Sequence, residues 1–234
     1  MEFWGKIFRS PTVVRVAPFV IFVLLTAGQG KFEPASAYWF YLAKTLVALW
    51  LLVALRPLIT EMRWAFSWEA VVVGIAVFGV WVGISGEWTT QSSLWIKLGI
   101  SKAPIIPTAA WNPNEQFGSG STLAGLFIAV RILGSTFIVP PLEEVFYRSF
   151  LYRYLAKHDF LSVPLNKFSP ISFLITVAVF GLAHNEWLAG ILCGAAFQWL
   201  VLRKNRLGDA MTAHAITNFL LGVWVVWRGA WNFW

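Results

Sequence analysis

Charged side chains and cysteine are scarce in this sequence, and their scarcity excludes several classes of protein. Asp, Glu, Lys and Arg make up only 12% of the 234 residues, whereas hydrophobic residues make up 58%. A water-soluble domain of this length could not bury so much apolar surface, so the composition predicts an integral membrane protein. The single cysteine, Cys193, excludes an internal disulfide, and we expect it to serve packing because it lies in an apolar stretch.

The sequence also lacks internal repeats and low-complexity tracts. Transporters commonly carry inverted repeats, so the absence of repeats disfavours that class. The excess of 18 Lys and Arg over 11 Asp and Glu lies mostly in short loops, which indicates membrane topology and no nucleic-acid partner. Fifteen tryptophans are typical of anchoring at membrane interfaces, and we expect Trp231 and Trp234 to be such anchors.

Long apolar runs predict an all-α, polytopic bundle of transmembrane helices. A spanning helix needs roughly 20 mostly apolar residues, so residues 1–234 predict one membrane domain of about seven or eight spans. We interpret the first run as a retained span and not as a cleaved signal. Residues 86–122 predict an extracytoplasmic loop with a short interfacial helix near Leu94 to Leu98. The apolar runs cover residues 12–28, 37–58, 67–85, 121–138, 141–157, 170–186, 187–202 and 208–228.

The basic loops decide how the proline pair Pro140 and Pro141 is interpreted. If the apolar runs on either side of the pair cross the membrane separately, the basic loops at 157–167 and 203–206 fall on the non-cytoplasmic side. That arrangement contradicts the excess of positive charge expected in cytoplasmic loops. If the prolines interrupt a span whose second half does not cross fully, both loops become cytoplasmic. We therefore predict a broken helix near Pro140 and Pro141, which is tolerated where it lines a polar cavity.

Two adjacent carboxylates follow the proline pair. Ionisable side chains inside spans cost about 2.5 to 3.5 kcal/mol each to insert, so they are candidates for function. Glu144 and Arg148 are four residues apart, share a helix face and can form a salt bridge in the membrane. Glu143 points about 100° away and lacks that partner. It can serve as a general base or acid, or it can simply interact with the dipole of the helix N-terminus.

Two histidines and an asparagine complete the candidate site. His184 ends an apolar run, where it serves either as a capping residue or as a partner of Glu143. Both residues are equally far along the chain from the loop near residue 163, so they lie at the same depth in an antiparallel hairpin. His214 and Asn218 share one face of the last apolar run, where Asn commonly joins helices. Straight helices would place His214 about 10 Å shallower than His184, so a tilt or a break near Gly190 or Gly194 is required.

These three motifs resemble the signature motifs of the CAAX-protease and bacteriocin-processing family, whose members are metal-independent intramembrane endopeptidases. The resemblance covers residues 121–228 and implies a catalytic core there, after N-terminal spans and a loop in residues 1–120. It implies that Glu143 and His184 activate a water, that His214 and Asn218 form an oxyanion hole, and that Glu144 and Arg148 hold the motif helix. No cofactor is implied.

A narrower similarity implies a substrate and a location. The segments at 131–135 and 183–190, with the Trp-rich ending, resemble the bacterial branch found with exosortase sorting systems. This similarity implies a multi-pass protein of the bacterial inner membrane, with exosortase-system components as partners. The substrate would be a membrane protein or peptide cut near a C-terminal sorting signal.

Two other functions remain open. Two His and two Glu residues can bind Zn²⁺, which would then activate the water, although no His-Glu-x-x-His motif is present and Asn is a poor zinc ligand. The chain can also be a non-catalytic membrane subunit of a protein-sorting or bacteriocin-immunity system. The presence of all four candidate residues favours catalysis.

Overall fold

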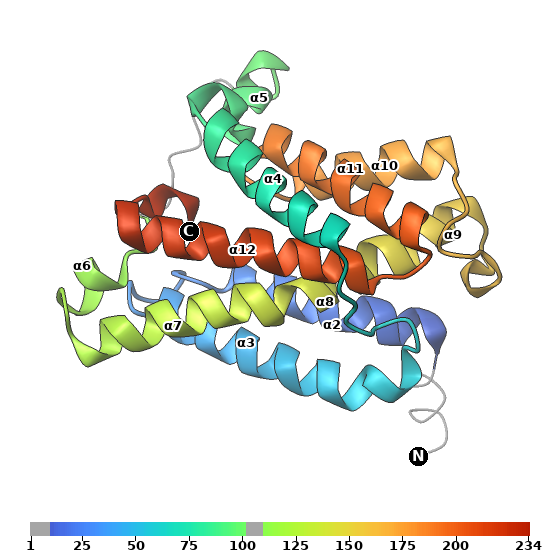
Figure 1. Ribbon diagram of the computed structural model, residues 1–234. Helices are drawn as coiled ribbons and strands as arrows, with labels where there is room; N and C mark the ends of the chain where they lie inside the picture. Colours follow the sequence, from blue (N-terminus) through green and yellow to red (C-terminus); the bar gives the residue numbers. More distant parts are fainter. Residues whose placement is uncertain (1–9, 102–109) are drawn as a thin grey trace.

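The structure, a computed structural model, describes residues 10–101 and 110–234, and every regular element in them is a helix (Figure 1). The all-α fold predicted from the sequence is confirmed. Part of the predicted loop, residues 102–109, lies outside the described residues. The helices are α2 (Pro11–Ala27), α3 (Ser36–Leu55), α4 (Trp68–Ile84), α5 (Gln91–Lys97), α6 (Pro113–Phe117), α7 (Thr122–Phe137), α8 (Val139–Glu144), the π-helical segment Val145–Leu151, α9 (Tyr152–Ala156), α10 (Pro170–Leu182), α11 (Trp187–Lys204) and α12 (Gly208–Arg228).

Several helices begin and end where the sequence supplies capping residues. The side chains of Ser67, Ser121 and Ser169 each accept a hydrogen bond from the backbone N–H three residues later, at the starts of α4, α7 and α10. Asn205, with φ 53°, follows the last residue of α11, and Gly229, with φ 64°, follows the last residue of α12. Both residues adopt the left-handed conformation that satisfies the last carbonyls of a helix. Local sequence therefore explains these boundaries.

Helix α12 lies within the bundle and packs against α4, α7, α8 and α11, while α10 packs on α11 (Figure 1). Glycines allow close approach at two of these crossings. A Cβ atom at Gly190 of α11 would lie 2.9 Å from the Cα of Gly181 in α10. A Cβ atom at Gly74 of α4 would lie 2.7 Å from the carbonyl oxygen of Ala213 in α12. Small residues of this kind let membrane helices approach closely.

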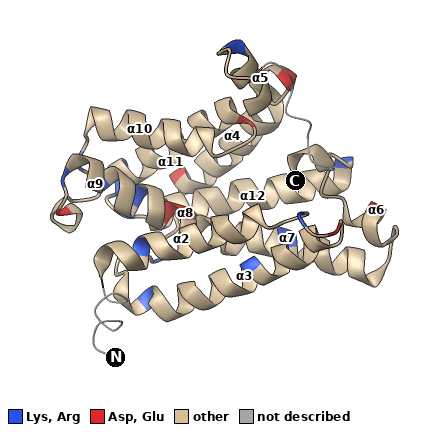
Figure 2. Cartoon of the chain, turned by 180° about the vertical axis from the view of Figure 1, so that it is seen from behind, with Lys and Arg blue, Asp and Glu red and all other residues tan. Residues whose placement is uncertain are grey.

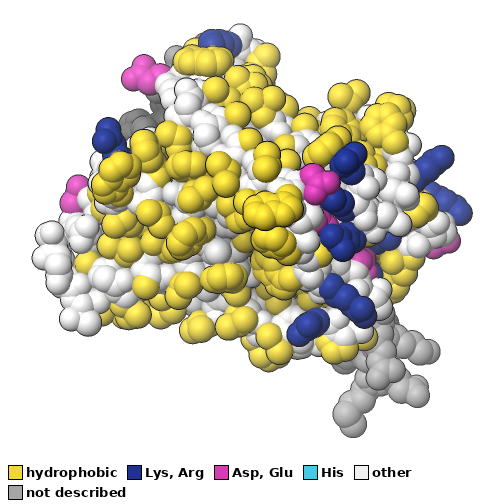
Figure 3. All heavy atoms as spheres, in the orientation of Figure 1, with side chains coloured by type: hydrophobic (Ala, Val, Ile, Leu, Met, Phe, Trp, Pro, Cys, Tyr) yellow, Lys and Arg dark blue, Asp and Glu magenta, His cyan; other side chains and the backbone are white. Residues whose placement is uncertain are grey.

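The outside of the bundle is rich in large apolar side chains (Figure 3). On α3, Trp50 and Val53 are 67% and 65% exposed, and on α10 Leu174 is 68% exposed. Water would penalise so much exposed apolar surface, whereas the hydrocarbon of a bilayer does not. The surface and the apolar helices together indicate a membrane protein.

The helices differ in how well their lengths suit a membrane span. Within residues 10–101 and 110–234, three helical segments are long and apolar enough to cross a membrane by length and composition alone, namely Ser36–Leu58, Thr122–Ala156 and Gly208–Arg228. Three more apolar helices are shorter, namely Pro11–Ala27, Trp68–Ile84 and Pro170–Leu182. Helix α10 has 13 residues, a length of about 20 Å, which is less than the hydrocarbon thickness of about 30 Å. The apolar runs were located correctly, but some helices end earlier than those runs.

The predicted break near the proline pair is present. Helix α7 ends at Phe137, Ile138 forms a turn, and α8 begins with Pro140 and Pro141 in its first turn. Proline is tolerated there because the first N–H groups of a helix have no partner within the helix. Helices α8 and α9 continue beyond α7 toward the same end of the bundle and do not turn back (Figure 1). The two apolar runs therefore form one broken helical segment and not two crossings.

Polar contacts gather the basic loops at one end of the bundle, which we call the basic end (Figure 2). Arg15 of α2 and Arg153 of α9 both pair with Glu61 in the loop before α4, at 2.8 and 2.9 Å. Lys204, at the end of α11, pairs with Glu69 at 2.7 Å. This arrangement is the one that the charge rule favours. Arg203 also pairs with Glu69, and Arg206 pairs with Asp209 at the start of α12.

Candidate active site

The buried centre of the site is the Glu144 carboxylate. Its Oε2 lies 3.3 Å from the Nε atom of Arg148, and its Oε1 lies 3.1 Å from the Nδ1 atom of His214. The Glu144 side chain is 0% exposed and that of Arg148 is 1% exposed. Arg148 also donates to the carbonyl oxygen of Gly194 at 3.2 Å. The predicted salt bridge is therefore present, and it joins the helix carrying the Glu pair to α11 and α12.

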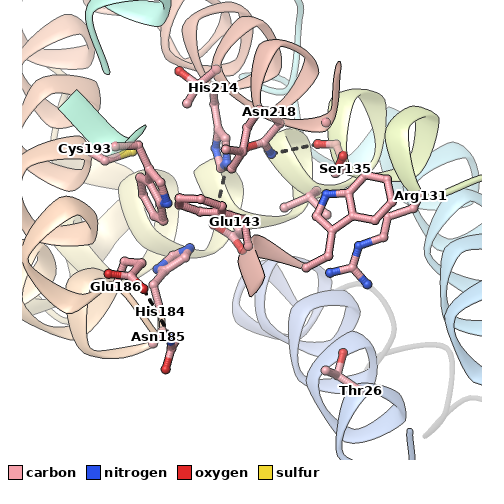
Figure 4. A pocket seen from close by; sticks show the side chains of 18 of the residues that line it. Thr26, Arg131, Ser135, Glu143, His184, Asn185, Glu186, Cys193, His214 and Asn218 are labelled. Carbon is pink, nitrogen blue, oxygen red and sulfur yellow. Dashed lines mark hydrogen bonds and ion pairs between the residues drawn. The ribbon is translucent and has the colours of Figure 1, made fainter. Parts of the chain in front are cut away.

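Glu143 has a different environment, as its position on the helix predicts. Its Oε2 is buried and has no hydrogen-bond partner among the described residues. The nearest ionisable group across the helices is His214, whose Nε2 lies 4.0 Å from that oxygen (Figure 4). Glu143 is thus a carboxylate without the compensating bonds that hold Glu144, and it can accept a proton from a water in the cavity.

One ring nitrogen of His214 makes a structural hydrogen bond. A carboxylate only accepts hydrogen bonds, so the Nδ1–H of His214 donates to Glu144. In the neutral ring the Nε2 atom, on the side of Glu143, is then an acceptor. A donor role for this atom requires a second proton on the ring. The ring stacks on Phe197, with centroids 5.0 Å apart, which fixes its orientation.

His184 presents a free nitrogen. Its Nδ1 lies 2.7 Å from the carbonyl oxygen of Phe180, one helical turn earlier. Because a carbonyl only accepts, Nδ1 carries the proton and Nε2 has an unshared electron pair. The ring packs between Phe180 and Trp81, with centroids 4.7 and 5.5 Å away. His184 therefore bonds the end of α10, as a capping residue does, and also lines the cavity.

Asn218 joins two helices. Its amide nitrogen donates to the carbonyl oxygen of Ser135 at 2.8 Å, just before the break between α7 and α8. This bond is the helix-to-helix contact that an intramembrane Asn commonly makes. The amide has a second N–H, and Asn218 lines the same cavity as Glu143. One donor therefore remains for a ligand.

All four candidate residues line one cavity of about 740 Å³ within the helical bundle. The cavity reaches residues distant from the basic end, namely Thr26 in the last turn of α2, Asn185 after α10 and Trp234. Figure 4 shows Glu143 between His184 on one side and Arg131 on the other. The structure thus brings together three motifs that are far apart in the sequence.

The depth mismatch expected between His184 and His214 does not prevent their meeting. Helix α11 is continuous through Gly190 and Gly194, so the break considered there is absent. Close helix crossing replaces it, since Gly190 contacts the backbone of Gly181 and Gly194 contacts the ring of Phe180. The ring of Phe180 lies 6.3 Å from that of His214 and 4.7 Å from that of His184, and so bridges the two.

From the sequence we expected His184 to be the partner of Glu143. In the structure the imidazole in contact with Glu143 is that of His214. Glu143 and His184 share the cavity, and no ion pair joins them among the described residues. Equal distance from a loop fixes depth along a hairpin and leaves the sideways separation of its helices undefined. The structure also shows the role of Trp234, which lies over Arg131 and lines the cavity, so it is more than the membrane anchor expected.

The lining includes two cations that the sequence argument did not single out as site residues, Lys44 of α3 and Arg131 of α7. The rule that flags ionisable residues inside spans applies to both of them. The sequence also left open a Zn²⁺ site formed by His and Glu residues. Within residues 10–101 and 110–234, no three His, Cys, Asp or Glu side chains are arranged to hold a metal ion.

Residues 125–220 match the family model described as Rce1-like, type II CAAX prenyl endopeptidase Rce1-like. This part of the chain is similar to the CAAX endopeptidases. No curated protein and no solved structure matches the chain. The Rce1-like region contains Glu143, His184, His214 and Asn218. The match supports the CAAX-protease family that the three motifs predict, and with it a peptidase.

Proposed function

We propose that this protein is an intramembrane endopeptidase that cuts a membrane-associated protein or peptide near its C-terminus. The observation that carries the proposal is the cavity, where residues of α8, α12 and the end of α10 converge inside an apolar bundle. The Rce1-like match supports the same class of reaction. Because the surrounding helices exclude water from the site, electrostatic interactions with the reacting groups are stronger there than in water.

In the proposed reaction Glu143 is the general base. Its carboxylate takes a proton as a water oxygen bonds to the carbonyl carbon of the scissile peptide. The free Nε2 of His184 orients that water by accepting its second hydrogen. The C–N bond then breaks, and the amine nitrogen receives the proton from Glu143. The products are a new carboxyl terminus and a new amine.

In the proposed reaction His214 and Asn218 stabilise the tetrahedral intermediate. The second N–H of Asn218 donates to the oxyanion, and His214 donates from Nε2 when its ring carries a second proton. Glu144 and Arg148 position His214 and the Glu pair, without touching the substrate. Each of the four proposed catalytic groups thus has a separate task.

We also propose a substrate and a location for this protein. The similarity of residues 131–135 and 183–190 to the exosortase-associated branch supports a bacterial inner-membrane protein that acts on a C-terminal sorting signal. It also supports components of that system as partners. Hydrolysis of such a signal requires no cofactor in this mechanism.

The test is cleavage of a panel of C-terminal membrane peptides by the purified protein in detergent. We expect Glu143→Gln and His184→Ala to abolish cleavage and to leave the protein folded. Glu87→Gln and His158→Ala are matched controls, because both side chains are exposed and lie outside the cavity. Normal turnover by Glu143→Gln or His184→Ala would reject the mechanism.

A strong zinc chelator distinguishes the metal alternative in the same assay. Cleavage that persists with chelator supports a glutamate-activated water, whereas cleavage lost with chelator and restored by Zn²⁺ assigns the water to the metal. A biological role that survives Glu143→Ala would favour the non-catalytic subunit.

A further inference from the structure

Two cations line the catalytic cavity without a carboxylate partner among the described residues. Lys44 is only 5% exposed, yet among residues 10–101 and 110–234 its Nζ has a single hydrogen-bond acceptor, the hydroxyl of Thr26 at 2.9 Å. Its ammonium also lies 4.5 Å from the ring centre of Phe22 and 4.6 Å from that of Tyr41. An ammonium has three donors, so this buried charge is incompletely satisfied.

Arg131 is the second cation. Its guanidinium lies 4.8, 4.6 and 5.3 Å from the ring centres of Tyr41, Trp111 and Trp234. Aromatic faces hold the group in place, but they offer its N–H donors no oxygen acceptor. Neither a hydrogen bond nor an ion pair from this guanidinium is present within the described residues. Tyr41 contacts both cations, so one aromatic ring holds the pair of charges at one wall.

No carboxylate of the cavity lies within ion-pair distance of these cations among the residues that the structure describes. Neither Glu143 nor Glu186 forms an ion pair with Lys44 or Arg131 in the described part of the chain. Glu186 instead accepts hydrogen bonds from Thr89 at 2.8 Å and from Asn185 at 3.3 Å.

Figure 4 places Glu186 beside His184, on the other side of Glu143 from Arg131. The cavity therefore has a cationic wall next to its proposed catalytic groups.

We propose that Lys44 and Arg131 bind the free C-terminal carboxylate of the peptide substrate, an inference that rests on the proposed function. A guanidinium fork and a second ammonium provide the charge-assisted hydrogen bonds that a carboxylate prefers. With the terminus held at this wall, the peptide bond near Glu143 lies a short distance before the end of the chain. The site thus selects substrates by a free carboxyl end and releases a short C-terminal fragment.

The experiment compares one cleaved peptide in two forms, with a free and with an amidated C-terminus. For the wild-type protein we expect amidation to raise KM about 10- to 100-fold, with little change in kcat, because it removes a charge-assisted bond. In Arg131→Gln and in Lys44→Gln we expect KM for the free acid to rise and the preference to fall below about threefold. A merely structural role would lower the active fraction for both peptides equally.

Arg228→Gln is the matched control. Arg228 also lies over two tryptophan rings, at 5.4 and 5.6 Å, but it is exposed and does not line the cavity. We expect this variant to keep the wild-type preference. Equal cleavage of both peptides by the wild-type protein would overturn the carboxylate site and leave the proposed function intact. A preference that persists in both cavity variants would likewise overturn the assignment to Lys44 and Arg131.

A binding measurement separates this inference from the proposed function. If the wild-type protein cuts neither peptide, binding of both forms to Glu143→Gln is measured with a quencher-labelled peptide and tryptophan fluorescence. If Glu143→Gln binds the free acid preferentially and the double variant Glu143→Gln with Arg131→Gln does not, the result supports the site although the proposed activity fails. Equal binding of both forms overturns the site.

Lipid phosphate is the competing source of an anion. Cleavage is therefore repeated in micelles with phosphatidylglycerol or with phosphatidylcholine. Loss of the acid preference in phosphatidylglycerol alone, together with inhibition that Arg131→Gln relieves, would assign the cations to a lipid and overturn the proposal.

Discussion

Replacing Glu144 by Gln tests whether this residue holds the site together or takes part in the chemistry. The carboxylate is fully buried and has two charged or polar partners, Arg148 at 3.3 Å and His214 at 3.1 Å. Gln has nearly the same volume and keeps one oxygen acceptor, but it removes the negative charge. Arg148 would then be a buried cation whose remaining polar contact is the carbonyl of Gly194.

The size of the effect follows from breaking a buried ion pair on one side only. Such a change costs about 3 to 5 kcal/mol, because an uncompensated charge remains. For a chain of this length, each kcal/mol lowers the unfolding temperature by about 2 to 4 °C, so we expect a loss of about 6 to 20 °C. Glu143→Gln removes a carboxylate whose one ion-pair contact among the described residues is the Nε2 atom of His214, 4.0 Å away, so we expect it to lower the unfolding temperature by less than about 3 °C.

Thermal unfolding of the purified variants in one detergent, followed by tryptophan fluorescence, measures this difference. The double variant Glu144→Gln with Arg148→Met completes a cycle, and we expect it to be more stable than the sum of the single losses by at least about 1 kcal/mol. Cleavage is measured well below each unfolding temperature. The reasoning is refuted if Glu144→Gln unfolds within about 2 °C of wild type, and loss of cleavage in that stable variant would assign Glu144 to the chemistry.

Three further changes probe other parts of the structure. Asn218→Ala should lower kcat about 100- to 1,000-fold if its free N–H stabilises the oxyanion, and an unchanged kcat would confine Asn218 to its bond with Ser135. Gly190→Ala should destabilise the protein by about 1 to 3 kcal/mol because its Cβ meets the backbone of α10, whereas Gly79→Ala, with nothing within 4 Å, should not. Burial alone would raise the pKa of Glu61, but the Ser149 hydrogen bond and the Arg15 charge outweigh it and hold this pKa below its ordinary value of 4.5. The stabilisation from Glu61 should therefore be present above pH 4.5 and be lost as the pH falls through the lowered pKa, so the difference in unfolding temperature between wild type and Glu61→Gln should shrink in acid.

Much of the fold could be predicted because its signals are local. Apolar runs located the long helices, and the capping serines, Asn205 and Gly229 lie at or next to their ends. The proline pair located the break between α7 and α8, and the charge rule predicted which end receives the basic loops. The exact helix ends could not be predicted, because hydropathy does not show that α10 ends at Leu182, before His184.

The candidate site was predicted in part. The spacing of Glu144 and Arg148 predicted their salt bridge, and the absence of a partner at that spacing predicted the unpaired Glu143. The approach of His214 to Glu143, at 4.0 Å, could not be predicted, since counting from a loop gives depth but not the neighbour across a bundle. The cations Lys44 and Arg131 also fit the rule for intramembrane charges, but they lie outside the three motifs, so the motifs do not mark them as site residues.

The sequence by itself determined that this protein lies in a membrane, where its helices are and where the break that follows α7 occurs, because each depends on the chemistry of neighbouring residues. Only the tertiary structure decided that Glu143 lies nearest to His214, that Glu144 holds His214, and that Lys44 faces the same cavity from α3. Those relations depend on how closely and at what angle the helices cross. Contacts such as Gly190 on Gly181 set that geometry between segments, and no local pattern specifies which helix meets which.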